Sequence, residues 1–250
     1  MLAQDDEGKG RALVFLHGIT GSGEQWEPIT ERLTASHRCV RIDLPGHGAS
    51  PPGAYDVFSV AAEIQAVVEA LELPDPILVG HSLGGILATV CGIVYAPGAV
   101  VNVDQQLAVG DLAQRVRANA DRLRGDGFQA FMDELFHELG LAAAPASVRT
   151  FIEQTTDPRQ DVVLGYWAPL LDADPAETAS ALESALPALA APYLALFGGP
   201  ISPEDERLLG LLPNATVEVW EGSGHFLHLI EPDRFVDRLR SFVAGVHGTA

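Results

Sequence analysis

Cysteine is scarce in this chain of 250 residues, which has only two. Cys39 and Cys91 each lie inside an apolar segment, the first in an expected strand and the second in an expected helix. Thiols in such segments are usually buried and unpaired. We therefore expect neither a disulfide nor a metal site.

Positive charge is scarce as well, because 15 lysines and arginines stand against 34 aspartates and glutamates, giving a formal net charge of −19. A charge of this sign and size repels phosphate backbones and anionic lipid surfaces. We therefore expect no nucleic-acid partner and no membrane partner. The same field favours a neutral or cationic small-molecule substrate over a polyanion.

Long uncharged apolar runs are also absent, and none reaches the length of a membrane span. The polar, acidic segment 1–10 lacks the basic and then apolar order of a secretory signal, so a cytoplasmic protein is the expectation. The hydrophobic content of 47% is enough for a substantial core. The length fits one α/β domain with an inserted subdomain.

What the sequence does contain is an alternation of short apolar runs and amphipathic stretches. This order predicts a doubly wound, mostly parallel α/β sheet of about six strands. The expected strands span 12–16, 39–42, 77–79, 99–103, 193–197 and 216–220, and helices are expected at 57–73, 85–95 and 232–244. Because only residues 1–11 precede the first strand, an exposed sheet edge is expected, which predicts pairing with a second copy in a homodimer.

The pattern changes to helices alone between residues 107 and 186. Apolar residues recur there at helical spacing, and Asp157 with Pro158 is expected to open one of the helices. An insertion between two strands of such a sheet predicts a helical lid over 107–186. The α/β core is then formed by 1–106 and 187–250.

Three aromatic residues are candidates for lining a substrate pocket. Phe136 and Trp167 belong to the expected lid, where residues that face the sheet can form an apolar pocket. Trp26 follows the first strand closely and is expected beside the loop at the end of that strand.

Residues 80–84 read Gly-His-Ser-Leu-Gly, between an expected strand and an expected helix. In a nucleophile elbow the serine has a strained backbone at a sharp turn, so the residues two before and two after must be small. Gly80 and Gly84 meet this demand. The alternative is a glycine-rich turn with an incidental serine, but the flanking elements favour an elbow at Ser82.

A serine hydroxyl is a poor nucleophile until a base removes its proton, so Ser82 needs a histidine and a carboxylate that orients it. The chain has eight histidines. His225 directly follows the last expected strand and is therefore expected at the same rim of the sheet as Ser82. His228 lies one helical turn further on, and His247 lies in the tail.

Four motifs in this order make the chain resemble the α/β-hydrolase superfamily. They are His-Gly at 17–18, Asp-Leu-Pro-Gly-His-Gly at 43–48, the elbow at 80–84 and Gly-His-Phe at 224–226. The resemblance implies that His225 is the general base and that His47 and His81 are scaffold residues.

The resemblance also implies an oxyanion hole made by the backbone amides of Ile19 and Leu83, which would stabilise the negative charge that develops on a carbonyl oxygen. The helix that begins behind Ser82 adds a favourable dipole. We do not expect epoxide opening or halide displacement, because related enzymes with those activities use a carboxylate nucleophile and this chain has a serine at position 82.

The position of the triad acid departs from the usual pattern. The resemblance places an acid in a Gly-x-x-Asp segment after the strand at 193–197, where this chain has Ile201. Asp104 ends the neighbouring strand and keeps the order serine, acid, histidine, so it is the expected acid. The alternatives are that Asp104 only caps its strand, or that Glu204 or Asp205 takes the role.

These features predict a lidded serine hydrolase that cleaves an ester or lactone of a medium-sized hydrophobic substrate, without a cofactor. Three alternatives stay open. The first is hydrolysis of a carbon–carbon bond. The second is a cofactor-free lyase or oxygenase, and the third is a receptor that has kept the fold without efficient catalysis.

Overall fold

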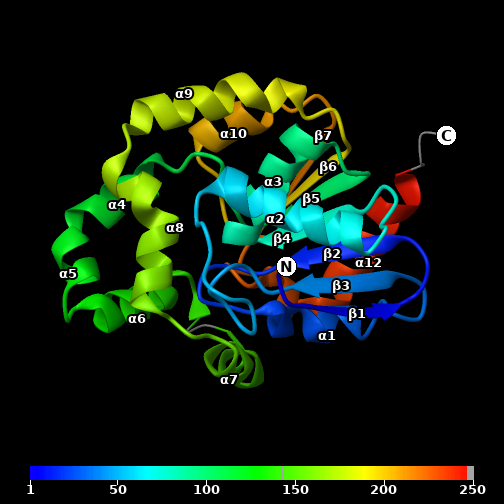
Figure 1. The fold of residues 1–250 in the computed structure, drawn as a ribbon, viewed down its shortest axis with the longest axis horizontal. Helices are drawn as coiled ribbons and strands as arrows, with labels where there is room; N and C mark the ends of the chain where they lie inside the picture. Colours follow the sequence, from blue (N-terminus) through cyan, green and yellow to red (C-terminus); the bar gives the residue numbers. More distant parts are fainter. Residues whose placement is uncertain (142–143, 247–250) are drawn as a thin grey trace.

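The computed structural model describes residues 1–141 and 144–246, so residues 247–250 of the predicted core lie outside it. Its centre is a seven-stranded sheet in the order β1-β3-β2-β4-β5-β6-β7 (Figure 1). The strands from β2 to β7 run parallel, which confirms the predicted fold class. The strands are β1 (Gln4–Gly8), β2 (Ala12–Leu16), β3 (Arg38–Ile42), β4 (Ile77–His81), β5 (Ala99–Val103), β6 (Tyr193–Phe197) and β7 (Ala215–Val219).

The seventh strand, β1, is additional to the six that the sequence predicted. It pairs antiparallel with β3 and occupies the sheet edge that we expected to be exposed. The sequence of β1 is polar, so it lacks the apolar pattern from which the other strands were predicted. Its backbone pairs with β3, and its Asp6 bonds Arg38, with a 2.6 Å Nη2–Oδ2 distance. A short, acidic edge strand discourages edge-to-edge pairing. Dimerisation stays a prediction that sedimentation velocity tests.

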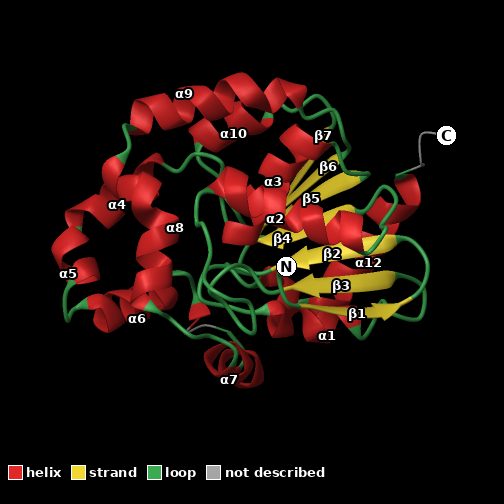
Figure 2. Ribbon diagram, in the orientation of Figure 1, coloured by secondary structure: helices red, strands yellow, loops and turns green. Residues whose placement is uncertain are grey.

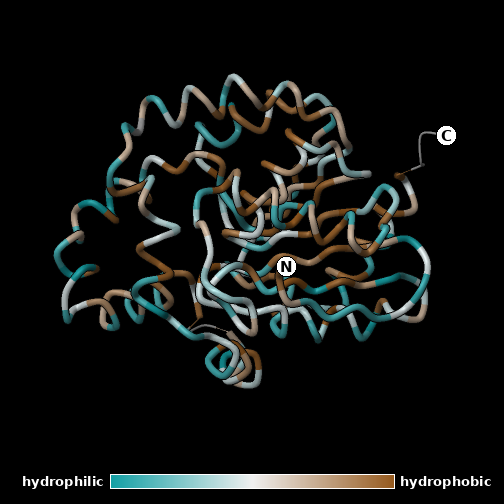
Figure 3. Tube along the Cα trace, in the orientation of Figure 1, coloured by the Kyte–Doolittle hydropathy of each residue, from teal (hydrophilic) through white to brown (hydrophobic). Residues whose placement is uncertain are grey.

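Helices cover both faces of the sheet (Figure 2). Alternate residues of each buried strand face the two sides, so the core has two halves. In Figure 3 the inner strands are largely coloured as hydrophobic. One face packs against α2 (Val57–Ala70), α3 (Leu83–Tyr95) and α10 (Pro203–Leu209), and the other against η1 (Gly23–Trp26), α1 (Glu27–Thr30), α11 (Leu227–Ile230) and α12 (Pro232–Gly245).

A set of helices lies beyond the carboxyl ends of the parallel strands, at the left of Figure 1, and its last member continues across the top beside α10. All of them come from the stretch between β5 and β6, so a helical insertion is present where the sequence predicted a lid. We call this insertion the lid, and its role as a cover over the site stays a prediction. The helices are α4 (Gly110–Ala118), α5 (Ala120–Arg124), α6 (Phe128–Glu138), α7 (Ala146–Gln154), α8 (Gln160–Asp172) and α9 (Pro175–Ala185), followed by the turn η3 (Leu186–Ala188). Within the described ranges, no helix has both the length and the apolar composition of a membrane span.

Helix α8 begins at Gln160, three residues later than the predicted opening at Asp157. The amide of Asp157 instead donates a 2.7 Å hydrogen bond to the carbonyl of Thr20, in the loop after β2. Asp157 is therefore held by the core and not by a helix of the lid.

Candidate active site

The backbone of Ser82 has the strained geometry of an elbow. Ser82 joins β4 to α3 with φ 51° and ψ −122°, a combination that is rare for a residue with a side chain. A Cβ at Gly80 would lie 2.0 Å from the carbonyl oxygen of Gly84, and one at Gly84 would lie 2.2 Å from that of Leu16. Only glycine fits at either position, and the turn holds Ser82 at the end of the strand.

Asp104 and His225 are joined by a short hydrogen bond at this rim. His225 Nδ1 donates to Asp104 Oδ2 over 2.6 Å. The other carboxylate oxygen, Oδ1, accepts a 2.7 Å hydrogen bond from the amide of Gly198, the first residue after β6. Both oxygens of Asp104 are therefore held, which fixes the carboxylate and, through it, the orientation of the imidazole.

The remaining candidate acids have other partners. Asp205 is fully buried, and its carboxylate accepts hydrogen bonds from the amide of Ala108 (2.9 Å) and the hydroxyl of Ser202 (2.7 Å). Glu204 pairs with Arg207 on the surface. Of the three carboxylates that the sequence nominated, Asp104 is the one that contacts His225 in the described structure.

Several contacts bring the His225 loop, the elbow and the loop after β2 together. His81 Nε2 donates a 2.9 Å hydrogen bond to the carbonyl of His225, and the two rings are 4.6 Å apart. A Cβ at Gly18 would lie 3.2 Å from both Ser82 Cβ and His81 Nδ1. The Ser82 side chain, the loop that carries His225 and the turn at Gly18 therefore lie together at one site.

We call residues 18–21 the oxyanion turn after the role that the sequence predicts for the Ile19 amide, and its first residue, Gly18, lies beside Ser82. The amide of Gly21 donates to the carbonyl of Gly18 over 3.1 Å, and Thr20 has φ 68°. Within the part of the chain that the structure describes, the amides of Ile19 and Leu83 have no acceptor. Free N–H groups beside a nucleophile can stabilise an oxyanion.

The other histidines near the rim are buried and serve as neutral scaffold. His17 Nδ1 donates to the carbonyl of Gly18 (2.7 Å), while its Nε2 accepts from the amide of Leu44 (3.0 Å). Burial lowers the pKa of His17 to about 3 and that of His228 likewise to about 3. Burial and the neighbouring histidines His225 and His228 also hold the pKa of His81 well below its usual value. The rings of His17 and His81 are held by hydrogen bonds, whereas Nδ1 of His228 is buried without a hydrogen-bond partner among the described residues.

The three aromatic pocket candidates occupy different environments. Trp26 is 0% exposed and packs on His228 and Phe235 under the sheet, so it presents no surface to a ligand. Trp167 is 6% exposed and meets Phe131 edge-on inside the lid. Phe136 is partly exposed and stacks 6.4 Å from Phe226, the neighbour of His225.

Phe136 also lines a cavity of about 370 Å³ between α6 and α7. Its wall is apolar where Met132, Phe136 and Ile152 meet, and it carries the charged residues Arg149 and Glu153. Of the three candidates, Phe136 is the one that combines exposure with a contact to the His225 loop.

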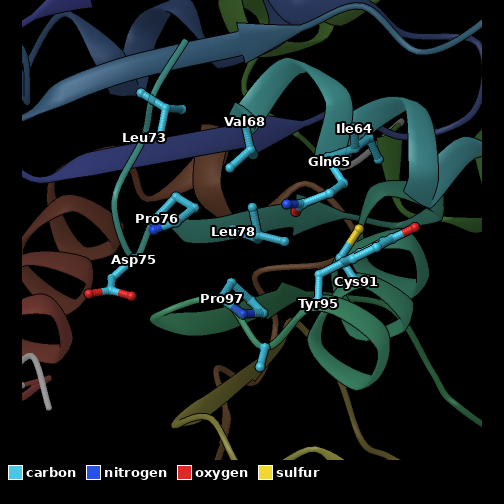
Figure 4. Close-up of a pocket in the computed structure, with 11 residues that line it drawn as sticks. Ile64, Gln65, Val68, Leu73, Asp75, Pro76, Leu78, Cys91, Tyr95 and Pro97 are labelled. Carbon is cyan, nitrogen blue, oxygen red and sulfur yellow. The ribbon is translucent and has the colours of Figure 1, made fainter. Parts of the chain in front are cut away.

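A second cavity, of about 170 Å³, lies at the opposite end of the strands (Figure 4). Ile64 and Val68 of α2 and Cys91 and Tyr95 of α3 line it, together with Leu78 of β4. Burial raises the pKa of the Cys91 thiol to about 12, so this thiol stays protonated and is a poor nucleophile. Cys91 is therefore not a candidate nucleophile, and Ser82 is the one that the site offers.

Sequence reasoning missed two parts of the site. It did not identify Gly198 as the donor to Asp104, although two consecutive glycines directly after β6 were a visible signal. It also missed Gln25, a buried side chain that reaches from η1 to the lid. No sequence pattern announces such a contact, because its partners are about 130 residues away.

Comparison with known proteins identifies the family to which this fold belongs. Residues 13–238 match the profile described as Alpha/beta hydrolase family. The chain is 32% identical over 243 residues to a 2-succinyl-6-hydroxy-2,4-cyclohexadiene-1-carboxylate synthase of Salmonella heidelberg, and the match covers 91% of this chain and 92% of that protein. Among solved structures, it resembles a thermophilic esterase from Thermogutta terrifontis (TM-score 0.80, 23% identity, covering 98% and 94% of the two chains). It also resembles MenH from S. aureus (TM-score 0.79, 19% identity, covering 97% and 98%). The chain belongs to the α/β-hydrolase family.

Proposed function

We propose that this protein is a serine hydrolase that cleaves a carboxylic ester or lactone through an acyl-enzyme on Ser82. The observation that carries the proposal is the 2.6 Å hydrogen bond from His225 to Asp104 beside the strained Ser82 elbow. Nucleophile, base and orienting acid are the three groups that acyl transfer requires.

In the first half of the proposed reaction, Ser82 Oγ attacks the carbonyl carbon while His225 Nε2 takes the hydroxyl proton. The carbonyl π electrons move onto oxygen, and the amides of Ile19 and Leu83 stabilise the resulting oxyanion. As the tetrahedral intermediate collapses, the bond to the alcohol oxygen breaks and His225 donates its proton to that oxygen. Asp104 holds the imidazole in the productive tautomer throughout.

In the second half, water attacks the acyl carbon and gives a proton to His225. The bond to Ser82 Oγ then breaks, the proton returns to the serine, and the carboxylic acid leaves. A lactone follows the same steps, except that its alcohol stays attached to the acyl group. All steps use side chains and backbone amides of this chain.

The proposed substrate class rests on the net charge of the chain and on the apolar side chains near Ser82. The net charge of −19 disfavours anionic ligands. The side chains at the site next to Ser82 include Ile19 and Leu83, both apolar and partly exposed. Phe136 of the lid adds an aromatic surface near His225. These features support a medium-sized, uncharged, hydrophobic acyl group.

The test is a panel of p-nitrophenyl esters from acetate to decanoate, together with uncharged γ- and δ-lactones, measured with wild type and Ser82→Ala. We expect turnover that peaks at intermediate chain length and disappears in the variant. Turnover that is equal in the two proteins, or absent from both across the whole panel, contradicts the proposal.

The second candidate is the synthase activity named for the Salmonella relative, favoured by 32% identity over 91% of this chain. Such an activity would use Ser82 and His225 without ester turnover. The named product carries two carboxylates, whereas the side chains beside Ser82 and in the oxyanion turn are uncharged. Incubation with the precursor of that product distinguishes the two candidates. Product formation that requires Ser82, without ester or lactone turnover, would replace the hydrolase proposal.

A further inference from the structure

The oxyanion turn is held from outside by hydrogen bonds at both ends of Thr20. Its amide donates to His47 Nε2 over 3.2 Å, and its carbonyl accepts from the amide of Asp157 over 2.7 Å. Thr20 is β-branched and has φ 68°, a conformation that is strained for a residue with a branched side chain. Its own hydroxyl is buried without a partner among the described residues. The conformation of the turn therefore depends on its neighbours.

One of these neighbours belongs to the lid. Residues 155–157, which we call the lid connection, begin the loop between α7 and α8, and the amide of Asp157 bonds the oxyanion turn. The turn that carries the Ile19 amide and the lid thus share a direct hydrogen bond. A displacement of the lid connection would remove the N–H donor that bonds the carbonyl of the strained residue Thr20.

Gln25 braces this junction. Its side chain is 5% exposed, and its Nε2 donates to the carbonyl of Thr155 (3.4 Å) and to the hydroxyl of Thr156 (3.3 Å). Its Oε1 covers Gly21, where an added Cβ would lie only 2.3 Å away. Gln25 therefore contacts the oxyanion turn with one end of its amide and the lid connection with the other.

We propose that Gln25 is a positioning residue that holds the lid connection on the oxyanion turn and thereby fixes the Ile19 amide where the oxyanion forms. The inference rests on the proposed function, because an oxyanion hole acts only in acyl transfer or a related reaction. Donors stabilise a transition state only when they are already in place, so a loosened turn lowers the rate of the chemical step. Ground-state binding of substrate does not depend on it.

The first test compares Gln25→Met with wild type and with Gln65→Met. Methionine keeps the length of the side chain but removes both donated hydrogen bonds. Gln65 is a control on α2, where its amide bonds Glu69 and, among the described residues, contacts neither the oxyanion turn nor the lid connection through a hydrogen bond. With p-nitrophenyl butyrate we expect Gln25→Met to lower kcat about tenfold with KM changed less than twofold. Labelling of Ser82 by a fluorophosphonate should slow by a similar factor, and Gln65→Met should match wild type.

The second test does not need ester turnover. Hydrogen–deuterium exchange should accelerate in Gln25→Met both in residues 17–26 and in residues 150–158, while the strands keep their protection. Thr156→Val, which removes one acceptor and leaves Gln25 in place, should give the same pattern at smaller amplitude. If wild type neither turns over esters nor labels, the proposed function fails, and exchange still tests the brace.

Three results overturn the inference. One is a kcat and labelling rate within twofold of wild type in folded Gln25→Met. Another is an effect on KM alone, which would assign Gln25 to substrate binding. The third is unchanged exchange in either segment.

Discussion

The ends of β5 and β6 differ in a way that explains how this site is built. β5 is followed by Asp104, whose carboxylate bonds His225. β6 is followed by Gly198, whose amide bonds that same carboxylate, and then by Ile201 at the position where related proteins would carry the acid. One strand end supplies the carboxylate that bonds His225, and the other supplies the amide that bonds this carboxylate.

The pairing register of β5 and β6 brings the residues that follow the two strands close together. Val103 at the end of β5 pairs with Leu196 of β6, so the residues that follow them lie side by side. Parallel strands bring their carboxyl ends to one rim. Substitutions at each strand end therefore test which of the two holds the carboxylate that acts on His225.

The largest effect is expected from Asp104→Asn. The amide can no longer act as the anionic partner of the imidazole and favours the wrong tautomer, so kcat for the best ester should fall about 10⁴-fold with the fold retained. The measurement is steady-state kinetics together with circular dichroism. Glu204→Gln, at an exposed acid in the segment after β6, is the control and should keep wild-type activity. A loss of less than tenfold in Asp104→Asn would assign the acid elsewhere.

Substitution of Gly198 tests the other strand end. A Cβ there would lie 1.9 Å from the carbonyl oxygen of Gly224, so Gly198→Ala must displace the loop that carries His225. We expect a loss of about 3 kcal/mol in the free energy of unfolding and a fall of about 10- to 100-fold in kcat. Gly199→Ala, where a Cβ meets no atom within 4 Å, should be neutral in both urea unfolding and kinetics. Equal behaviour of the two variants would contradict the role of Gly198.

A further pair of variants tests whether a carboxylate after β6 can replace the one after β5. In the Asp104→Asn background, adding Ile201→Asp should recover about tenfold of the lost kcat, because it places a carboxylate after the neighbouring strand. Ile201→Asp alone should change kcat by less than threefold. The same kinetic assay measures both. Absence of any recovery would mean that the loop after β6 does not deliver a carboxylate to His225 in this chain.

A smaller effect concerns histidines that have no acid beside them. His17 and His228 have folded-state pKa values of about 3, below the usual 6.5, because they are buried. The unfolded chain therefore binds more protons between these values, and stability should decline as the pH falls from about 6.5 towards 3. At pH 5 each histidine should contribute a loss of about 2 kcal/mol relative to neutral pH.

His228→Phe isolates one of these contributions, since the aromatic ring can keep its packing on Trp26 and Phe235. Urea unfolding at pH 7.5 and pH 5 should show a smaller difference in the variant than in wild type. An unchanged difference would show that His228 does not take up a proton when the chain unfolds.

The core of the fold was predictable because its strands are apolar runs bounded by turn residues. The expected bounds 12–16, 99–103 and 193–197 match β2, β5 and β6. β1 was not predictable in this way, because its stability depends on backbone pairing with β3 and on ion pairs with arginines of that strand. Such partners are visible only once the sheet is assembled.

The site was predictable to the extent that chain order determines position at the rim. Ser82, Asp104 and His225 each follow a strand, and parallel strands bring such residues together. The pocket was less predictable: Trp26 has the sequence neighbourhood of a pocket residue but is enclosed under the sheet. The brace by Gln25 depends on a lid loop whose path no local pattern determines.

The most direct measurement is to trap the proposed intermediate. Wild type and Ser82→Ala would be mixed with p-nitrophenyl butyrate, quenched in acid within milliseconds, and examined by intact and peptide mass spectrometry. The account predicts a burst of p-nitrophenol and a butyryl group on Ser82 in wild type, with neither in the variant. Turnover without a Ser82 adduct, or turnover that persists in Ser82→Ala, would contradict it.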